Sequence, residues 1–166
     1  MKKKLVLATM NKGKLAEFEH LLLPLDFELF TLDDLQIGEI EETADSFDGN
    51  AKLKAKAVRT LTKEMILADD SGLKVDALNG KPGVHSKRFS ELGTDEANNQ
   101  YLLKLMENEI ERSATFVAAF FLYLPSGEMQ LFCGECLGYI HTAIEWEECF
   151  GYEPLFIPVG YNHTLA

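Results

Sequence analysis

Short apolar runs typical of buried strands alternate with stretches of helical spacing, and this alternation constrains the fold more than any other feature of the sequence. We expect the alternating segments at 3–8, 12–23, 27–31, 46–61 and 65–68. Two longer apolar runs, 115–124 and 129–140, then flank the turn residues Pro125-Ser126-Gly127-Glu128 and predict a hairpin. Crossover helices join parallel strands and tight turns join antiparallel ones, so the sequence predicts an α/β fold with a mixed sheet.

Two further segments complete this reading of the chain. The turn residues Asp69-Asp70-Ser71-Gly72 predict a break between the strand at 65–68 and a short strand at 73–75. Thr94 is a suitable N-cap for a helix running to about residue 109, because Asp95 and Glu96 follow it in the first turn. A last short strand is expected at 155–157.

The composition fits one folded domain over residues 1–166. The chain is 46% hydrophobic and carries a net charge of -11, which excludes a disordered tail and argues against a general nucleic-acid-binding protein. We recognise neither a secretory signal nor a membrane span, and three cysteines make a disulfide framework improbable, so we expect a cytoplasmic protein. Cys133-x-x-Cys136 lies in a predicted strand, which favours a structural role over metal or redox chemistry.

The basic residues are unevenly distributed along the chain. Residues 1–14 hold five lysines and no acid, residues 15–50 hold eleven acids and no Lys or Arg, and no Lys or Arg follows Arg112. Solvated faces alone could produce this pattern. Alternatively, the cations are placed where a small anionic ligand binds.

Three groups of residues could carry chemistry. Residues 9–14, between a buried strand and a helix, offer backbone N–H groups and two lysines to a phosphate, although the P-loop pattern is absent. Glu41-Glu42 and Asp69-Asp70 supply hard oxygen ligands for Mg²⁺ and a carboxylate able to activate water, or Asp-Ser-Gly simply caps its own turn. The aromatic loop 150–154 could stack a ring on a flat base, or merely plug the core.

Together these segments resemble the inosine/xanthosine triphosphate pyrophosphatases, which remove deaminated purine nucleotides. The matching motifs are T-x-N-x-x-K from Thr9, E-E-T from Glu41, S-F-x-x-N-A-x-L-K-A from Ser46, A-D-D-S-G-L from Ala68, G-x-P-G-V-x-S-x-R-F from Gly80 and F-G-Y-E-P from Phe150. The resemblance runs from residue 4 to about residue 166. A-D-D-S-G-L followed by P-G-x-x-S is its most specific part.

The resemblance implies an elongated mixed β-sheet with flanking helices, forming two lobes around a central nucleotide cleft. It also implies a homodimer and Mg²⁺-dependent hydrolysis of ITP, dITP or XTP to the monophosphate and pyrophosphate. Glu42 and Asp70 would hold the metal, and Asp70 would activate water with Asp69 in support. Phosphate would bind to Thr9, Met10, Asn11, Lys12, Gly13, Lys14, Lys54 and Ser71, and the base to Phe150, Gly151, Tyr152 and Glu153.

The sequence departs from the family pattern at several points. Met10 stands where the family often has Gly, and Glu153 where it usually has Asp. The Lys and the Ser-His-Arg segment of the family's final helix, which read the base, are missing from residues 1–166, so we expect weak base discrimination. Two alternatives stay open: a Maf-type pyrophosphatase for pyrimidine or modified nucleotides, and a catalytically impaired nucleotide-binding remnant.

Overall fold

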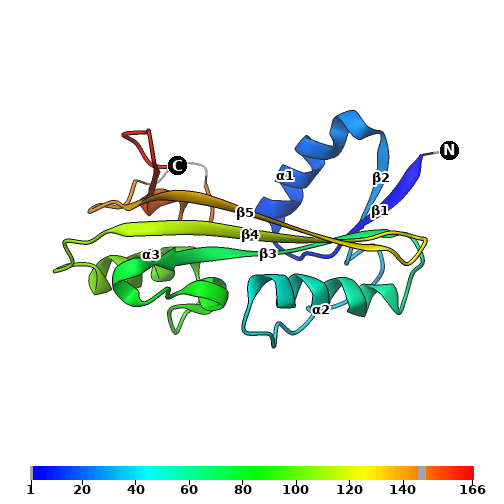
Figure 1. Ribbon diagram of the computed structural model, residues 1–166, viewed down its shortest axis with the longest axis horizontal. Helices are drawn as coiled ribbons and strands as arrows, with labels where there is room; N and C mark the ends of the chain where they lie inside the picture. Colours follow the sequence, from blue (N-terminus) through cyan, green and yellow to red (C-terminus); the bar gives the residue numbers. More distant parts are fainter. Residues whose placement is uncertain (1, 146–148) are drawn as a thin grey trace. The chain divides into compact units, whose positions relative to one another are not determined.

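The computed structural model describes residues 2–145 and 149–166, in which six strands form one open mixed sheet (Figure 1). The strand order is β2-β1-β3-β4-β5-β6. β1 pairs in parallel with β2 and β3, and β5 pairs antiparallel with β6. The strands are β1 Lys3–Leu7, β2 Phe27–Thr31, β3 Met65–Val75, β4 Ser113–Tyr123, β5 Met129–Ile140 and β6 Phe156–Pro158. The predicted α/β class with a mixed sheet is confirmed.

The chain divides into two compact units, each with its own buried residues. Unit 1 comprises Met1–Asp70 and Ala119–Cys133, and unit 2 comprises Ser71–Ala118 and Gly134–Ala166. Strands β3, β4 and β5 contribute residues to both units. Among the described residues, no helix has the length and apolarity to span a membrane.

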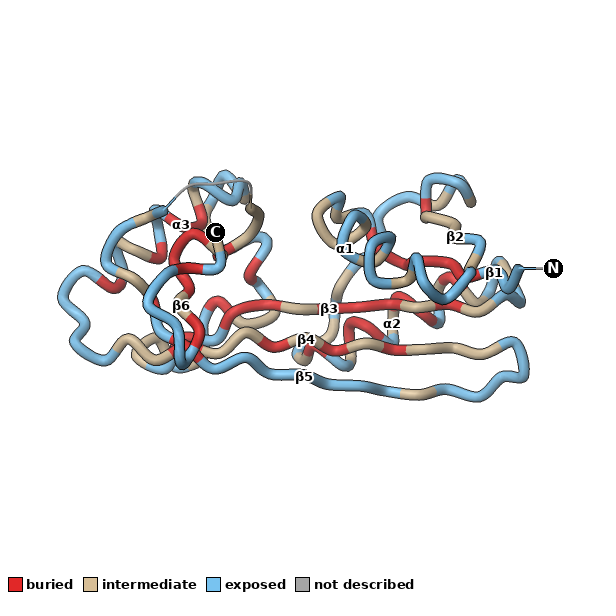
Figure 2. The backbone as a smooth tube through the Cα atoms, turned by 90° about the horizontal axis from the view of Figure 1, so that it is seen from above, coloured by how far each residue is buried: buried red, intermediate tan, exposed pale blue. Residues whose placement is uncertain are grey.

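In unit 1, two helices lie on opposite sides of the strands (Figure 1). α1 (Lys12–Leu22) begins where the Asn11 side chain accepts the Lys14 N–H at 3.2 Å, and α2 (Phe47–Arg59) begins where Ser46 accepts the Gly49 N–H at 3.2 Å. These caps satisfy N–H groups that the first turn of a helix leaves unpaired. Figure 2 shows the buried stretches of β1 and β3, two neighbouring strands inside the sheet.

In unit 2, α3 (Asp95–Leu105) packs its apolar side chains against the far parts of the long strands. Thr94 caps it as predicted, accepting the Ala97 N–H at 3.2 Å. The helix ends at Leu105 rather than near residue 109, and β6 begins one residue later than expected, after the 3₁₀ turn Glu153–Leu155. The buried core comprises Leu73, Val75, Leu102, Met106, Ala114, Ile140, Tyr152, Leu155 and Phe156.

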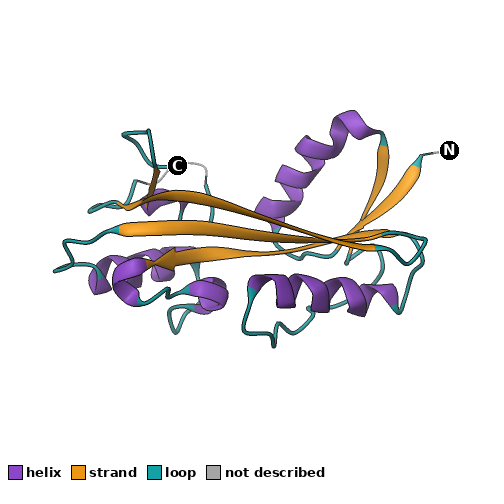
Figure 3. Cartoon of the chain, viewed as in Figure 1, coloured by secondary structure: helices purple, strands orange, loops and turns teal. Residues whose placement is uncertain are grey.

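The predicted turn at residues 69–72 is wrong, because β3 runs unbroken from Met65 to Val75 (Figure 3). β1 pairs with Met65–Leu67, ahead of the predicted turn, and β4 is the neighbour on the other edge of β3, so long-range pairing in the sheet outweighs the local turn preference of Asp-Ser-Gly. Asp69 and Asp70 are 3% and 5% exposed. Two carboxylates therefore sit in a buried central strand, where a charge is costly unless it has partners.

Candidate active site

The start of α1 places polar groups at the carboxyl end of β1, as predicted. Thr9 is buried, and its hydroxyl accepts the Asn11 N–H at 3.2 Å. Asn11 in turn caps the helix through the Lys14 N–H. Met10 is 40% exposed and Lys12 is exposed, while Gly13 and Lys14 are half-buried. A helix N-terminus preceded by a strand is a favourable place for phosphate oxygens.

Asp70 in β3 is a buried carboxyl group with a strongly raised pKa. Burial raises its pKa from 3.8 to about 6, and the negative charge of Glu42 acts in the same direction. A hydrogen bond from Asn50 Nδ2 to Asp70 Oδ2, 3.0 Å long, opposes the rise, as do the charges of Lys54 and Lys14. A carboxylate with a pKa near 6 is ionised at neutral pH and is more basic than an ordinary aspartate, which suits a general base.

Two lysines reach this region from the two helices of unit 1, and each pairs with a carboxylate. Lys14 Nζ of α1 lies 2.6 Å from Asp69 Oδ2, and Lys54 Nζ of α2 lies 2.7 Å from Glu42 Oε1. The side chains of Lys14, Lys54 and Asp69 are 17%, 9% and 4% exposed, so solvent screens these pairs less than surface ones. We call Lys14, Glu42, Lys54, Asp69 and Asp70 the charged cluster.

The structure also reveals a residue of this site that the sequence reasoning missed. Asn50 is 1% exposed, accepts the Ala44 N–H at 2.9 Å and donates to Asp70, so it ties the loop before α2 to β3. The available signal was the spacing of Asn50 and Lys54, four residues apart on one face of α2. Asp69, expected only as support, proves to be the partner of Lys14.

The donors of the charged cluster fit Mg²⁺. Asp69 Oδ1 is buried and accepts no hydrogen bond from the described residues. Within the same residues, no group of three or more His, Cys, Asp or Glu side chains gathers to hold a metal. Mg²⁺ in nucleotide enzymes commonly uses one or two carboxylates together with water and substrate phosphates, so a closed protein cage is not required.

In unit 2, the predicted base-binding residues form a hydrogen-bonded loop, residues 150–153. The Phe150 N–H donates to Glu153 Oε2 at 3.0 Å, and the Tyr152 hydroxyl donates to the Ser86 carbonyl at 2.7 Å. Burial raises the pKa of Tyr152, with the charge of Asp95 acting in the same direction, so the phenol stays protonated and remains a donor. Phe150 is half-buried, and Ser71 in β3 is half-buried as well.

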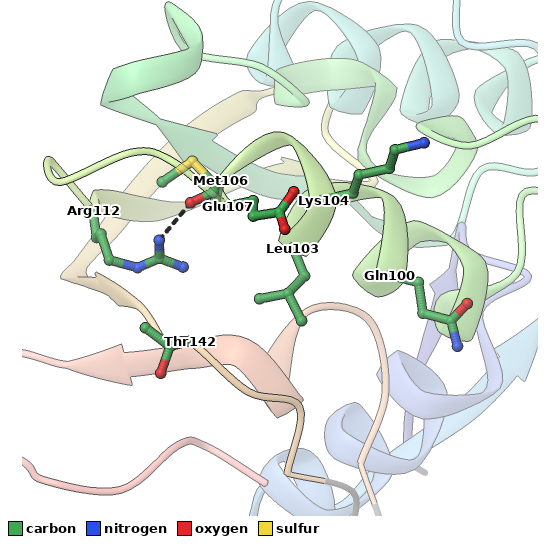
Figure 4. Close-up of a pocket in the computed structure, with 7 residues that line it drawn as sticks. All are labelled: Gln100, Leu103, Lys104, Met106, Glu107, Arg112 and Thr142. Atoms are coloured by element: carbon green, nitrogen blue, oxygen red, sulfur yellow. Dashed lines mark hydrogen bonds between the residues drawn. The ribbon is translucent and has the colours of Figure 1, made fainter.

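A pocket of about 470 Å³ in unit 2 involves none of the predicted site residues (Figure 4). The guanidinium of Arg112 donates to the carbonyls of Met106, Glu109, Ile140 and His141. Its donors are therefore used to tie the end of α3 to the end of β5. The residues lining the pocket are Gln100, Leu103, Lys104, Met106, Glu107, Arg112 and Thr142.

The structure is that of an α/β protein whose open mixed sheet carries buried aspartates and two paired lysines, groups suited to a metal ion and a phosphate. Comparisons with known proteins identify the family. The Ham1 family model matches residues 5–166. The dITP/XTP pyrophosphatase of Oceanobacillus iheyensis is 40% identical over 99% of this chain and 86% of its own length. That of an Exiguobacterium species is 45% identical over 98% of this chain and 84% of its own length.

Solved structures agree with the sequence comparison. The Ham1 protein of Staphylococcus aureus matches with a TM-score of 0.86 and 36% identity, over 99% of this chain and 85% of that one. A HAM1 protein from Coxiella burnetii matches with a TM-score of 0.88 and 33% identity, over 99% and 86%. The chain belongs to the Ham1 family, and the resemblance inferred from its motifs is confirmed.

Proposed function

We propose that this protein hydrolyses deaminated purine nucleoside triphosphates, namely ITP, dITP and XTP, to the monophosphate and pyrophosphate. Its relatives carry the name dITP/XTP pyrophosphatase at 40–45% identity over nearly the whole chain. The observation that carries the proposal is buried Asp70, whose pKa is raised to about 6 within the charged cluster. The function would be removal of damaged nucleotides from the cellular pool.

Asp70 is the proposed general base. Its Oδ2 is held by the Asn50 amide, so the carboxylate has a defined orientation when it takes a proton from the attacking water. Pyrophosphate then leaves from the α-phosphorus as a new P–O bond forms to the water oxygen. The protein contributes mainly by positioning these groups and by neutralising charge.

Lys14 and Lys54 are the proposed phosphate ligands, with the N–H groups of residues 9–13 in support. Both ammonium groups pair with carboxylates in the free protein, which holds them in place and partly screens their charge. A triphosphate would compete for them with Asp69 and Glu42. Ser71 follows Asp70 along β3 and is the proposed hydroxyl donor to the same phosphates.

Glu42 and Asp70 are the proposed ligands of Mg²⁺, and Asp69 Oδ1, which accepts no hydrogen bond from the part of the chain that the structure describes, is available to support it. When bound, the ion would neutralise the phosphate oxygens and the pyrophosphate leaving group. The proposal is tested by chelation: activity should be lost in EDTA and should return with excess Mg²⁺.

Phe150, Gly151, Tyr152 and Glu153 are the proposed base-binding residues. A phenylalanine ring can stack on a purine, a contact worth about 1–3 kcal/mol. Tyr152 anchors the loop through Ser86 rather than offering its hydroxyl to a ligand. Glu153 accepts the Phe150 N–H, so its carboxylate helps to fix the orientation of the stacking residue.

The decisive experiment is pyrophosphate release from ITP by the wild type and by Asp70→Asn. We expect turnover to be about 10²–10⁴-fold slower in the variant, and equal rates would refute the assignment of Asp70. A panel of ITP, XTP, dITP, GTP, ATP, UTP and dTTP then tests the substrate class. Preference for UTP or dTTP would instead support the Maf-type alternative.

Two expectations from the family resemblance remain predictions. A homodimer is tested by sedimentation equilibrium of the purified protein at micromolar concentration, where a single species of 18.6 kDa would contradict it. A cytoplasmic location is tested by fractionation of the source cells.

A further inference from the structure

One residue of the 150–153 loop, Gly151, is held through both its N–H and its carbonyl by side chains of α3. The Gly151 N–H donates to Asp95 Oδ2 at 2.8 Å, and the Gly151 carbonyl accepts from Asn99 Nδ2 at 2.6 Å. Asp95 and Asn99 are four residues apart, so they project from the same face of the helix. We call this pair the α3 clamp. It belongs entirely to unit 2.

The side-chain amide of Asn99 is oriented to donate to carbonyl groups. The side chain is fully buried, and Nδ2 also donates to the Asp95 carbonyl at 2.8 Å. Both neighbours of Nδ2 are acceptors, which fixes the orientation of the amide, because a reversed amide would place an oxygen against two carbonyls. Asn99 Oδ1 is buried and accepts no hydrogen bond from the described residues. Burying such an oxygen is unfavourable, so packing alone does not account for an amide here.

The clamped residue adopts a conformation that would otherwise be weakly defined. Gly151 has φ of +61°, and a Cβ built on it would meet nothing within 4 Å. A glycine is therefore favoured at this position by its positive φ angle, and not by a lack of room for a side chain. A glycine in the left-handed region has many accessible alternatives, and two hydrogen bonds to a helix select one of them.

The same helix also holds the segment 86–90, which contacts the 150–153 loop through Ser86. Asn98 Oδ1 accepts the Ser90 N–H at 2.8 Å, and Asn98 Nδ2 donates to the Lys87 carbonyl at 3.1 Å. This fixes the segment that contains Ser86, whose carbonyl accepts the Tyr152 hydroxyl. α3 therefore holds Gly151 directly and Tyr152 through the segment that contains Ser86. Phe150 directly precedes the clamped residue, Gly151.

We propose that Asn99, together with Asp95, is a positioning residue that sets purine affinity and base selectivity by holding Gly151, and hence Phe150 and Glu153, in one conformation. The inference rests on the proposed function of the 150–153 loop. Neither side chain needs to touch the nucleotide. Removing the clamp lowers the fraction of molecules whose loop is ready to bind, and apparent affinity falls by that fraction.

The test compares binding and turnover in Asn99→Ala, Asp95→Ala and Asp95→Asn. An asparagine at position 95 can still accept the Gly151 N–H, so it should recover most of what alanine loses. Leu102→Val is the matched control, because Leu102 is a buried core residue of the same helix and its truncation lowers stability without removing a hydrogen bond to the loop. Calorimetry measures IMP and pyrophosphate binding separately, and steady-state kinetics give kcat and KM for ITP and ATP.

In Asn99→Ala we expect roughly tenfold weaker IMP binding and a similar rise in KM for ITP, as for loss of one ordering hydrogen bond. Pyrophosphate affinity should be unchanged, kcat should stay within about threefold, and the preference for ITP over ATP should fall. Asp95→Ala should behave similarly. The double alanine variant should be little worse than either single variant, because both side chains hold the same residue, Gly151.

The outcomes separate this inference from the proposed function. If the wild type hydrolyses ITP but Asn99→Ala matches Leu102→Val in IMP affinity and selectivity, the clamp is overturned while the function stands. If IMP binds and is weakened selectively by both alanine variants, yet ITP is not hydrolysed, the clamp is supported and the proposed function fails. If Asn99→Ala does not fold, the Asp95 pair decides the matter, because Asp95 is exposed at the helix start. A wild type that neither binds IMP nor hydrolyses ITP overturns both.

Discussion

Asp70→Asn should make the protein far less active and at the same time more stable. The substitution keeps the size of the side chain, and the asparagine Oδ1 can still accept the hydrogen bond from Asn50 Nδ2. What it removes is a buried negative charge beside Glu42. Catalysis needs that charge as a base, whereas folding is opposed by it.

The magnitude follows from the pKa. A rise from 3.8 to about 6 is about two units, and each unit corresponds to about 1.4 kcal/mol, so the ionised group costs about 3 kcal/mol. The folded state holds its proton more tightly than the unfolded state between these two pKa values. Asp70 therefore contributes its full stability below pH 4, and that contribution is lost as pH rises through 6. For a chain of 166 residues, about 3 kcal/mol corresponds to roughly 6–12 °C in Tm.

The assay is thermal unfolding of the wild type and Asp70→Asn from pH 4 to 8 in EDTA, so that divalent cations do not contribute. The difference in Tm should be small near pH 4 and should reach its plateau above about pH 7. Asp45→Asn removes an exposed aspartate and should show no comparable pH-dependent gain. In Mg²⁺, ITP hydrolysis by Asp70→Asn should fall by about 10²–10⁴-fold, the usual contribution of a general base.

Two results would refute this reasoning. A variant that is less stable than the wild type at pH 7–8 in EDTA would show that the Asp70 charge does not oppose folding. A Tm difference that is independent of pH would mean that the gain arises from something other than ionisation. Retained activity with the expected stability change would leave the electrostatics intact and remove Asp70 from the role of base.

Three further perturbations test other parts of the structure. Lys54→Gln removes a charge that lowers the pKa of Asp70, so the acidic limb of the kcat/KM profile for ITP should move to higher pH, and an unmoved limb would contradict that coupling. The Arg59 guanidinium donates to three backbone carbonyls and lies 4.1 Å from the centre of the Tyr123 ring. Arg59→Lys should therefore lower the free energy of unfolding in urea by about 1–2 kcal/mol and leave KM for ITP unchanged. Gly138→Ala should cost more than about 2 kcal/mol because its Cβ would overlap β6, whereas Gly134→Ala on the same strand meets nothing within 4 Å and should unfold at nearly the wild-type urea concentration.

The parts of the structure that the sequence predicted well depend on neighbouring residues. Thr94 and Ser46 cap their helices through N–H groups three residues away, so their roles can be read from a few residues of sequence. The hairpin turn at 125–128 and the alternation of strands and helices also depend on residues close together in the sequence, so both could be predicted. The turn expected at 69–72 failed because β3 pairs with β4, from a distant part of the chain, and this pairing decides the conformation there.

The site residues that the sequence did not reveal are amides on helices. Asn50 and Asn99 act on partners 20 and 52 residues away, and an asparagine within a helix has no local pattern that separates a surface position from a buried clamp. Asn50 lies four residues from Lys54 and Asn99 lies four residues from Asp95, so each asparagine shares a helix face with that residue. Only the tertiary structure shows which backbone or carboxylate groups those faces meet.

The charged cluster explains why the pKa of Asp70 is raised. The cluster contains three carboxyl groups and two ammonium groups, and Lys14 pairs with Asp69 while Lys54 pairs with Glu42. Asp70 receives its hydrogen bond from a neutral amide instead. With all five groups ionised, one negative charge has no positive partner in these two pairs. That charge lies on Asp70, and its burial therefore raises the pKa of Asp70. The two ion pairs thus hold the lysines in place and leave Asp70 as the basic group of the site.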